Sequence, residues 1–330
     1  MTTKNIQKYL LLAVLIFLVL SIILAFAPLP IMVLTTQGSF LLLAILYPVI
    51  KKRSIMEHLR LRSAPLRAFL LMAAVILLYI PVASFLTISS MAMYNALGFK
   101  PIVMPDLTST FTPLVSLLLF SLTPGICEEV FFRGTLLSAY ERPLSRTQAL
   151  LWSSIFFGVI HFSPYNLLSP IALGLIFGLF TLKYNSIFPA IFGHAFFNSS
   201  VLLVELIEPY MDIDPSDTLD PAAVNIVDVV SVLPIALIAL ALIYLIFRKM
   251  NIFKPLQVVV PEYQIIERPA DFDFAEESDP LILEEKPRGR RPLGHFFIFS
   301  VIILVLLYIL LFIPTQMNLP DVELVVRSLT

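Results

Sequence analysis

Two adjacent carboxylates, Glu128 and Glu129, interrupt an apolar stretch of the chain, and Arg133 follows one helical turn later. Ionisable residues inside a membrane span are costly and are functional hypotheses by default. The i,i+4 spacing puts Glu129 and Arg133 on one helix face, where opposite charges pair. We therefore expect Glu129 to form an orienting ion pair with Arg133, which leaves Glu128 as the general base. The spacing alone leaves open which of the two glutamates is the base.

Two further polar groups follow, each with a four-residue spacing. His161 comes four residues after Phe157, and His194 comes four residues before Asn198. At this spacing His194 and Asn198 share a helix face, and both side chains can donate hydrogen bonds to a developing oxyanion. Alone, each group is more typical of helix packing in membranes. Together with Glu128, which could share a water with His161, they predict hydrolysis by activated water.

The composition predicts an all-α polytopic membrane protein. Apolar residues make up 58% and charged residues 14% of the 330 residues, and several apolar runs reach the ~20 residues that cross a bilayer. We expect the lipid bilayer as a partner and no nucleic acid. The glutamate helix should bend or break at Pro124. We predict nine spans: 9–27, 31–50, 66–87, 112–139, 148–162, 166–182, 187–206, 226–247 and 296–313.

Basic residues predict the orientation of these spans. All 22 Lys and Arg except Lys100, Arg133 and Arg327 fall before the first span or in alternate connections. Positive charge marks the cytoplasmic side, so we expect a cytoplasmic N-terminus and, after nine spans, an external C-terminus. At 1.5 Å per residue, the polar groups reach similar depths with a bias toward the cytoplasmic face. We therefore expect substrate entry from that face or laterally from the lipid.

The chain divides into four predicted regions. The first three spans belong to an N-terminal region, and the glutamates and histidines belong to a catalytic core. A charged linker rich in proline follows, with a composition that cannot bury a core. A last helix and a short tail complete the chain. These regions are 1–108, 109–249, 250–294 and 295–330.

The polar groups, in this order, resemble the motifs of the CPBP intramembrane proteases, also called the Abi or type II CAAX prenyl endopeptidase family. The motifs are Glu128-Glu129-x-x-x-Arg133, Phe157-x-x-x-His161 and His194-x-x-x-Asn198. The resemblance covers about residues 110–205 and implies an eight-helix core, to which the ninth span is an addition. It also implies that Glu128 and His161 activate water and that His194 and Asn198 stabilise the oxyanion.

The resemblance further implies an intramembrane endopeptidase of the bacterial cell membrane. Its substrate would be a peptide or protein with a hydrophobic or membrane-anchored C-terminal region, and its role peptide maturation or bacteriocin self-immunity. Water-based hydrolysis needs no cofactor. An alternative is a zinc-dependent protease that holds its metal with Glu128, His161 and His194, although the sequence has no H-E-x-x-H motif.

Two alternatives from other functional classes remain. The glutamates and histidines could serve as the proton relay of a proton-coupled transporter. Carriers commonly show duplicated halves, and the sequence has no detectable internal repeat, which counts against this class. The chain could also be a non-catalytic scaffold that acts by binding, although all the motif positions are intact.

Overall fold

The computed structural model describes residues 3–98, 111–161, 163–207, 210, 220 and 222–252. None of these residues forms a strand, in agreement with the predicted all-α class. The elements are α1 Thr3–Ile23, α2 Leu29–Ile50, α3 Ile55–His58, α4 Leu66–Ala96, α5 Pro113–Ser116, η1 Leu117–Leu122, α6 Thr123–Glu129, η2 Val130–Leu137, α7 Ser138–Tyr140, α8 Arg146–Val159, η3 Pro164–Asn166, α9 Leu168–Tyr184, α10 Phe188–Ile207 and α11 Ile226–Lys249.

Six helices among the described residues are long and apolar enough to cross a membrane. They are α1, α2, α4, α10, α11 and the continuous helix 113–140, and they correspond to six of the predicted spans. The other two predicted spans in this part of the chain become α8 and α9, with only 14 and 17 residues. The predicted span 296–313 and most of the predicted linker 250–294 lie outside the described residues.

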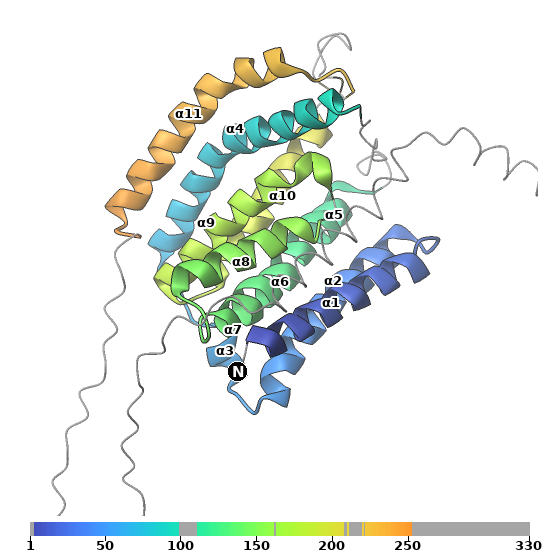
Figure 1. The fold of residues 1–330 in the computed structure, drawn as a ribbon, viewed down its shortest axis with the longest axis vertical. Helices are drawn as coiled ribbons and strands as arrows, with labels where there is room; N and C mark the ends of the chain where they lie inside the picture. Colours follow the sequence, from blue (N-terminus) through green and yellow to red (C-terminus); the bar gives the residue numbers. More distant parts are fainter. Residues whose placement is uncertain are drawn as a thin grey trace, which may run out of the picture.

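The helices form a central group with a helix pair on each side (Figure 1). The helix 113–140, α8, α9 and α10 make the central group, in which α10 contacts α6, η1 and α9 and α8 contacts α9 and η2. On one side, α1 packs on α2, and α2 packs on α6 and η2. On the other side, α4 packs on α9 and α10, and α11 packs on α4. The motif residues therefore lie on helices of the central group.

The helix that carries the glutamates is continuous from 113 to 140, but it contains two π-helical segments, η1 and η2. Pro124 does not break it. Instead, the backbone N–H of Thr123 donates to the carbonyl of Leu118 five residues earlier, in the wider π pattern. Gly125 then lets α6 approach α10 closely, because a side chain there would meet the backbone nitrogen of Ala195 at 3.1 Å. This close approach brings the glutamate turn beside the helix of His194.

Two glycines of α9 allow it to pack tightly on its neighbours. A Cβ at Gly178 would lie 2.3 Å from Leu150 of α8. A Cβ at Gly174 would lie 3.1 Å from both the Ser154 Cα and the guanidinium of Arg133. A side chain at Gly174 would press on the α8 backbone at Ser154, and one at Gly178 would displace the Leu150 side chain. The G-x-x-x-G spacing thus serves close packing of α8, α9 and the glutamate helix.

Three connections meet at one end of the bundle, which we call the basic end: residues 51–65, 141–145 and 185–187. Arg60 forms an ion pair with Glu141, and the carbonyl of Arg60 accepts a hydrogen bond from the backbone N–H of Ile187 at 3.2 Å. The hydroxyl of Ser186 donates to the carbonyl of Arg62 at 2.6 Å. These bonds tie together connections that the charge pattern places on a single side of the membrane.

Candidate active site

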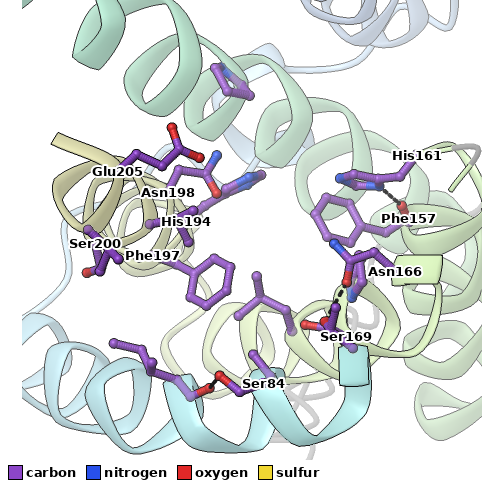
Figure 2. Close-up of a pocket in the computed structure, with 18 of the residues that line it drawn as sticks. Ser84, Phe157, His161, Asn166, Ser169, His194, Phe197, Asn198, Ser200 and Glu205 are labelled. Atoms are coloured by element: carbon purple, nitrogen blue, oxygen red, sulfur yellow. Dashed lines mark hydrogen bonds between the residues drawn. The ribbon is translucent and has the colours of Figure 1, made fainter. Parts of the chain in front are cut away.

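The four predicted catalytic side chains line one cavity of about 720 Å³. Glu128 comes from α6, His161 from the turn that follows α8, and His194 and Asn198 from α10. Figure 2 shows His161 facing His194 and Asn198 across the open space. Most of the remaining lining is apolar and comes from α4, α9 and α10. Glu129 and Arg133 are absent from the lining, so the two adjacent glutamates have different surroundings.

Glu128 has one occupied and one available carboxylate oxygen. Its Oε1 accepts a hydrogen bond of 2.8 Å from Nε2 of Gln37 on α2. Its Oε2 is buried and has no hydrogen-bond donor among the described residues. Nε2 of His161 lies 4.0 Å from Oε2. This separation is too long for a direct hydrogen bond, but it fits one bridging water.

The ring of His161 is oriented by the helix that precedes it. Its Nδ1 lies 2.7 Å from the carbonyl oxygen of Phe157. Because a carbonyl only accepts, Nδ1 carries the hydrogen, and in the neutral ring Nε2 is an acceptor. Glu128 Oε2 and His161 Nε2 are therefore two acceptors that lie 4.0 Å apart at the cavity wall. A water between them would donate one hydrogen to each.

Glu129 is the centre of a closed charge cluster, and its predicted ion pair with Arg133 is confirmed. Its Oε1 accepts from Arg133 Nη1 at 2.8 Å and from His194 Nδ1 at 2.9 Å. Arg133 Nη2 donates to the carbonyl of Gly174 at 3.2 Å. The side chains of Glu129 and Arg133 are fully buried. Opposite charges and hydrogen bonds offset part of the cost of burying these groups, while Glu129 Oε2 and Arg133 Nε are buried without a hydrogen-bond partner among the described residues.

Aromatic rings separate this cluster from the cavity. The guanidinium of Arg133 lies 4.1 Å from the ring centre of Phe157, in cation–π geometry. Phe157 also contacts the rings of His161 and His194 edge-on, at 5.0 and 5.6 Å between ring centres. Phe177 stacks on His194 at 5.4 Å. These contacts fix the rings of both histidines by packing as well as by hydrogen bonds.

Asn198 and His194 each already donate one hydrogen bond within the protein. Asn198 Nδ2 donates to the carbonyl of Phe120, in the π-helical η1, at 3.1 Å. Since an amide nitrogen carries two hydrogens, one remains for a ligand. The Nδ1 hydrogen of His194 is used by Glu129. His194 can donate to an oxyanion only from Nε2, and therefore only when both of its ring nitrogens are protonated.

The cavity extends toward the end of the bundle opposite the basic end. Its walls include Thr87 and Met91 in the second half of α4, Asn166 between α8 and α9, and Val204 near the end of α10. The predicted bias of the cavity toward the basic end is therefore wrong. The depth estimate counted only the four polar groups, whereas the cavity is formed mainly by apolar residues farther along each helix.

Three contributing residues were not identified from the sequence. Gln37 bonds the candidate base, Phe177 stacks on His194, and Gly174 supplies a carbonyl to Arg133. Gln37 had a readable signal, because it is a lone amide in the middle of an apolar span. Phe177 had none, since it is one of 27 phenylalanines in an apolar chain.

The residues proposed as zinc ligands do not form a ready metal site. In the part of the chain that the structure describes, no three His, Cys, Asp or Glu side chains lie close enough together to hold a metal ion. His194 also presents its protonated Nδ1 to Glu129, so only Nε2 is available for coordination. We therefore derive no chemical step through a metal.

The comparisons with known proteins agree with the position of these motifs. Residues 110–200 match a family model described as type II CAAX prenyl endopeptidase Rce1-like. No curated protein and no solved structure matches the chain. The matched segment contains the whole glutamate helix, α8, α9 and the motif positions of α10. It confirms the resemblance found in the sequence: over residues 110–200, this chain of apolar helices is similar to the Rce1-like type II CAAX prenyl endopeptidases, a family of membrane proteases.

Proposed function

We propose that the protein is an intramembrane endopeptidase that hydrolyses peptide bonds with a water activated by Glu128 and His161. The observation that carries this proposal is the pair of acceptors, Glu128 Oε2 and His161 Nε2, held 4.0 Å apart at the wall of the cavity. A water that donates to both atoms turns a lone pair of its oxygen away from them and toward a bound substrate. The match to a family of endopeptidases supports the same reaction class.

The chemical step follows from these positions. The water oxygen attacks the carbonyl carbon of the scissile bond while its proton passes to Glu128 Oε2. The carbonyl oxygen becomes an oxyanion, which the Nε2–H of a doubly protonated His194 and the second amide hydrogen of Asn198 stabilise. Collapse of the tetrahedral intermediate breaks the C–N bond, and the proton on Glu128 moves to the leaving amine. Glu129 holds the His194 ring and balances its charge.

The substrate class that we propose is a peptide or protein with a hydrophobic or membrane-anchored C-terminal region. Its support is the apolar lining of the cavity, with Ile80, Met91, Leu173 and Val201 among the residues that a hydrophobic segment would contact. Binding of an apolar segment in this cavity is favourable in proportion to the apolar surface area that it removes from water. Peptide maturation and bacteriocin self-immunity are the biological roles in which we place such cleavage.

For the cellular location we propose a bacterial cell membrane with the basic end, and hence the N-terminus, on the cytoplasmic side. The support is the positive-inside rule applied to the short connections. With this orientation the cavity opens toward the outer half of the membrane, because its walls continue away from the basic end. The external C-terminus depends on the predicted span 296–313, which lies outside the described residues.

Cleavage of a peptide library by the purified protein in liposomes tests the proposal. The wild type would be compared with Glu128→Gln, His194→Ala and, as a matched control carboxylate, Glu141→Gln at the basic end. Because a general base contributes about 10²- to 10⁴-fold, we expect Glu128→Gln to lose at least 100-fold in kcat and Glu141→Gln to retain activity. Equal activity of wild type and Glu128→Gln would contradict the mechanism.

Two further arms separate the alternatives. A chelator should leave cleavage unchanged on the water mechanism, whereas loss that zinc restores would establish the zinc-dependent protease held by Glu128, His161 and His194. Proton uptake driven by a peptide gradient, with the peptide left intact, would establish a proton-coupled transporter. Binding of peptides without cleavage or transport would establish a scaffold.

A further inference from the structure

Gln37 donates a hydrogen bond to Glu128, and it lies on a helix outside the segment that matches the family model. The contact joins Gln37 Nε2 to Glu128 Oε1 at 2.8 Å across 91 positions of sequence. A hydrogen bond to a carboxylate is charge-assisted and stronger than a bond between neutral groups. A polar amide in the middle of an apolar helix thus has a specific partner, and this partner is the candidate base.

The helix of Gln37 is fixed against the glutamate helix by two contacts that follow the Gln37–Glu128 contact along both helices. Three residues further along α2, the Phe40 ring packs on Phe131 with 5.2 Å between ring centres. One turn later, the carbonyl of Ala44 accepts from the hydroxyl of Thr135 at 3.1 Å. These contacts hold the α2 backbone in register with α6 and η2. The amide of Gln37 therefore meets Glu128 from a fixed direction.

This contact decides which carboxylate oxygen remains for chemistry. Gln37 occupies Oε1, so the available Oε2 is the oxygen that lies 4.0 Å from His161. Without the amide, the carboxylate could rotate about its last torsion, which has broad minima. The two carboxylate oxygens of Glu128 would then exchange positions. The arrangement in which one of them and His161 Nε2 together hold the water would exist for only part of the time.

We propose that Gln37 is a positioning residue for the reaction: its amide donates to Glu128 Oε1 and thereby holds Oε2 toward His161 and the attacking water. The proposal rests on the proposed hydrolytic function and adds a residue from α2 to a site otherwise built by the helix 113–140, the turn after α8, and α10. A residue that only joined helices would affect folding and would have no specific effect on turnover.

Kinetics of two near-isosteric variants separate positioning from packing. Gln37→Met removes the donor, and Gln37→Glu places a second acceptor against Glu128. Because Gln37→Met removes a charge-assisted hydrogen bond that orients the base, we expect it to lower kcat roughly 10-fold with KM within twofold of wild type. Gln37→Glu should lose more than Gln37→Met. Gln7→Met replaces a buried glutamine outside the cavity lining and should leave kcat unchanged.

The kinetic result overturns the proposal if kcat per folded molecule is the same in Gln37→Met and the wild type. Equal losses in Gln37→Met and Gln37→Glu would also overturn it, because packing alone would then explain them. Folded protein is counted by size-exclusion chromatography, so a variant that misfolds is not scored as catalytically impaired.

A second measurement needs no substrate, so it keeps this proposal distinct from the hydrolytic function. Thermal unfolding in detergent is compared for Gln37→Met, Glu128→Met and the double variant. Residues that share a hydrogen bond give non-additive effects, so Gln37→Met should lower Tm in the wild-type background and not in the Glu128→Met background. An equal fall in both backgrounds would show that the two side chains do not interact, whether or not any peptide is cleaved.

Discussion

The protein contains two regions in which arginine, glutamate and histidine lie together, and they are organised in opposite ways. Beside the cavity, Glu129 and Arg133 are fully excluded from solvent and bond each other at 2.8 Å. At the basic end, Arg146 and Glu141 lie 3.2 Å apart, and the Arg146 side chain is 41% exposed. Water can replace Glu141 as a partner of Arg146, but it cannot replace the partners of Glu129 or Arg133. The number of hydrogen bonds and ion pairs that each charge makes within the protein therefore matters for stability in the interior, where water cannot replace them.

The histidines of the two regions differ in the same way. His194 donates a hydrogen bond to the carboxylate of Glu129. His58 instead stacks on Tyr47, and the charged groups that act on it are Arg53 and Arg60. Burial, with a smaller effect of the two arginines, lowers the pKa of His58 from 6.5 to about 4. The basic end thus holds a neutral histidine among cations, while the cavity side gives a histidine a negative partner.

The sharpest test of this comparison is to break the buried ion pair. Arg133→Met leaves Glu129 buried without its main partner, and removal of one member of such a pair costs about 3–5 kcal/mol. We expect a large fall in the free energy of unfolding, measured by denaturant titration in detergent. The double variant Glu129→Leu with Arg133→Met removes both charges and should recover much of this loss. A loss below about 1 kcal/mol for Arg133→Met would show that water reaches Glu129 after all.

A smaller effect is expected when the basic end is acidified. The unfolded chain binds a proton at His58 below about pH 6.5, whereas the folded protein binds it only near pH 4. Protonation therefore favours unfolding in this window, and the stability contributed by the neutral ring is lost as the pH falls from about 6.5 to about 4. His58→Phe keeps the stacking on Tyr47 and should flatten this part of the pH profile. An unchanged profile would contradict the assignment.

The smallest effect should come from the exposed ion pair. Arg146→Gln removes the contact with Glu141 and a 3.2 Å hydrogen bond to the carbonyl of Leu182. Partly exposed ion pairs contribute about 0–1 kcal/mol, so we expect a change in unfolding free energy below about 1 kcal/mol. The same denaturant titration measures it beside Arg133→Met. A loss as large as that of the buried pair would remove the distinction between the two regions.

The sequence predicted the central group better than its surroundings. Glu129 and Arg133 were paired correctly from their i,i+4 spacing, although Arg133 itself lies in the π-helical segment η2. The shared cavity of Glu128, His161, His194 and Asn198 was anticipated from depth alone. Gln37 was missed because its role depends on the register of α2 against α6, and no local pattern encodes contacts between distant helices.

The direction in which the cavity extends also could not be predicted from local sequence patterns. Polar residues such as His161 stand out in an apolar chain, whereas most of the other lining residues are apolar, of types that also face lipid and helix interfaces. Which of these residues surround empty space depends on how α4, α9 and α10 diverge. That divergence results from packing contacts of the whole bundle, such as those of Gly174 and Gly178 on α8 and the glutamate helix.

The two π-helical segments around the glutamate turn change the directions in which side chains point around the helix axis. A π-bulge accommodates one residue more than α-helical winding would, and each residue in an α-helix advances the side chains by about 100°. A single-residue deletion within Leu117–Leu122 would therefore restore regular winding, and it would remove the wider turn in which the Thr123 N–H bonds the carbonyl of Leu118. In this helix, length is as strongly constrained as residue identity, and insertions or deletions should be tolerated far less than apolar substitutions.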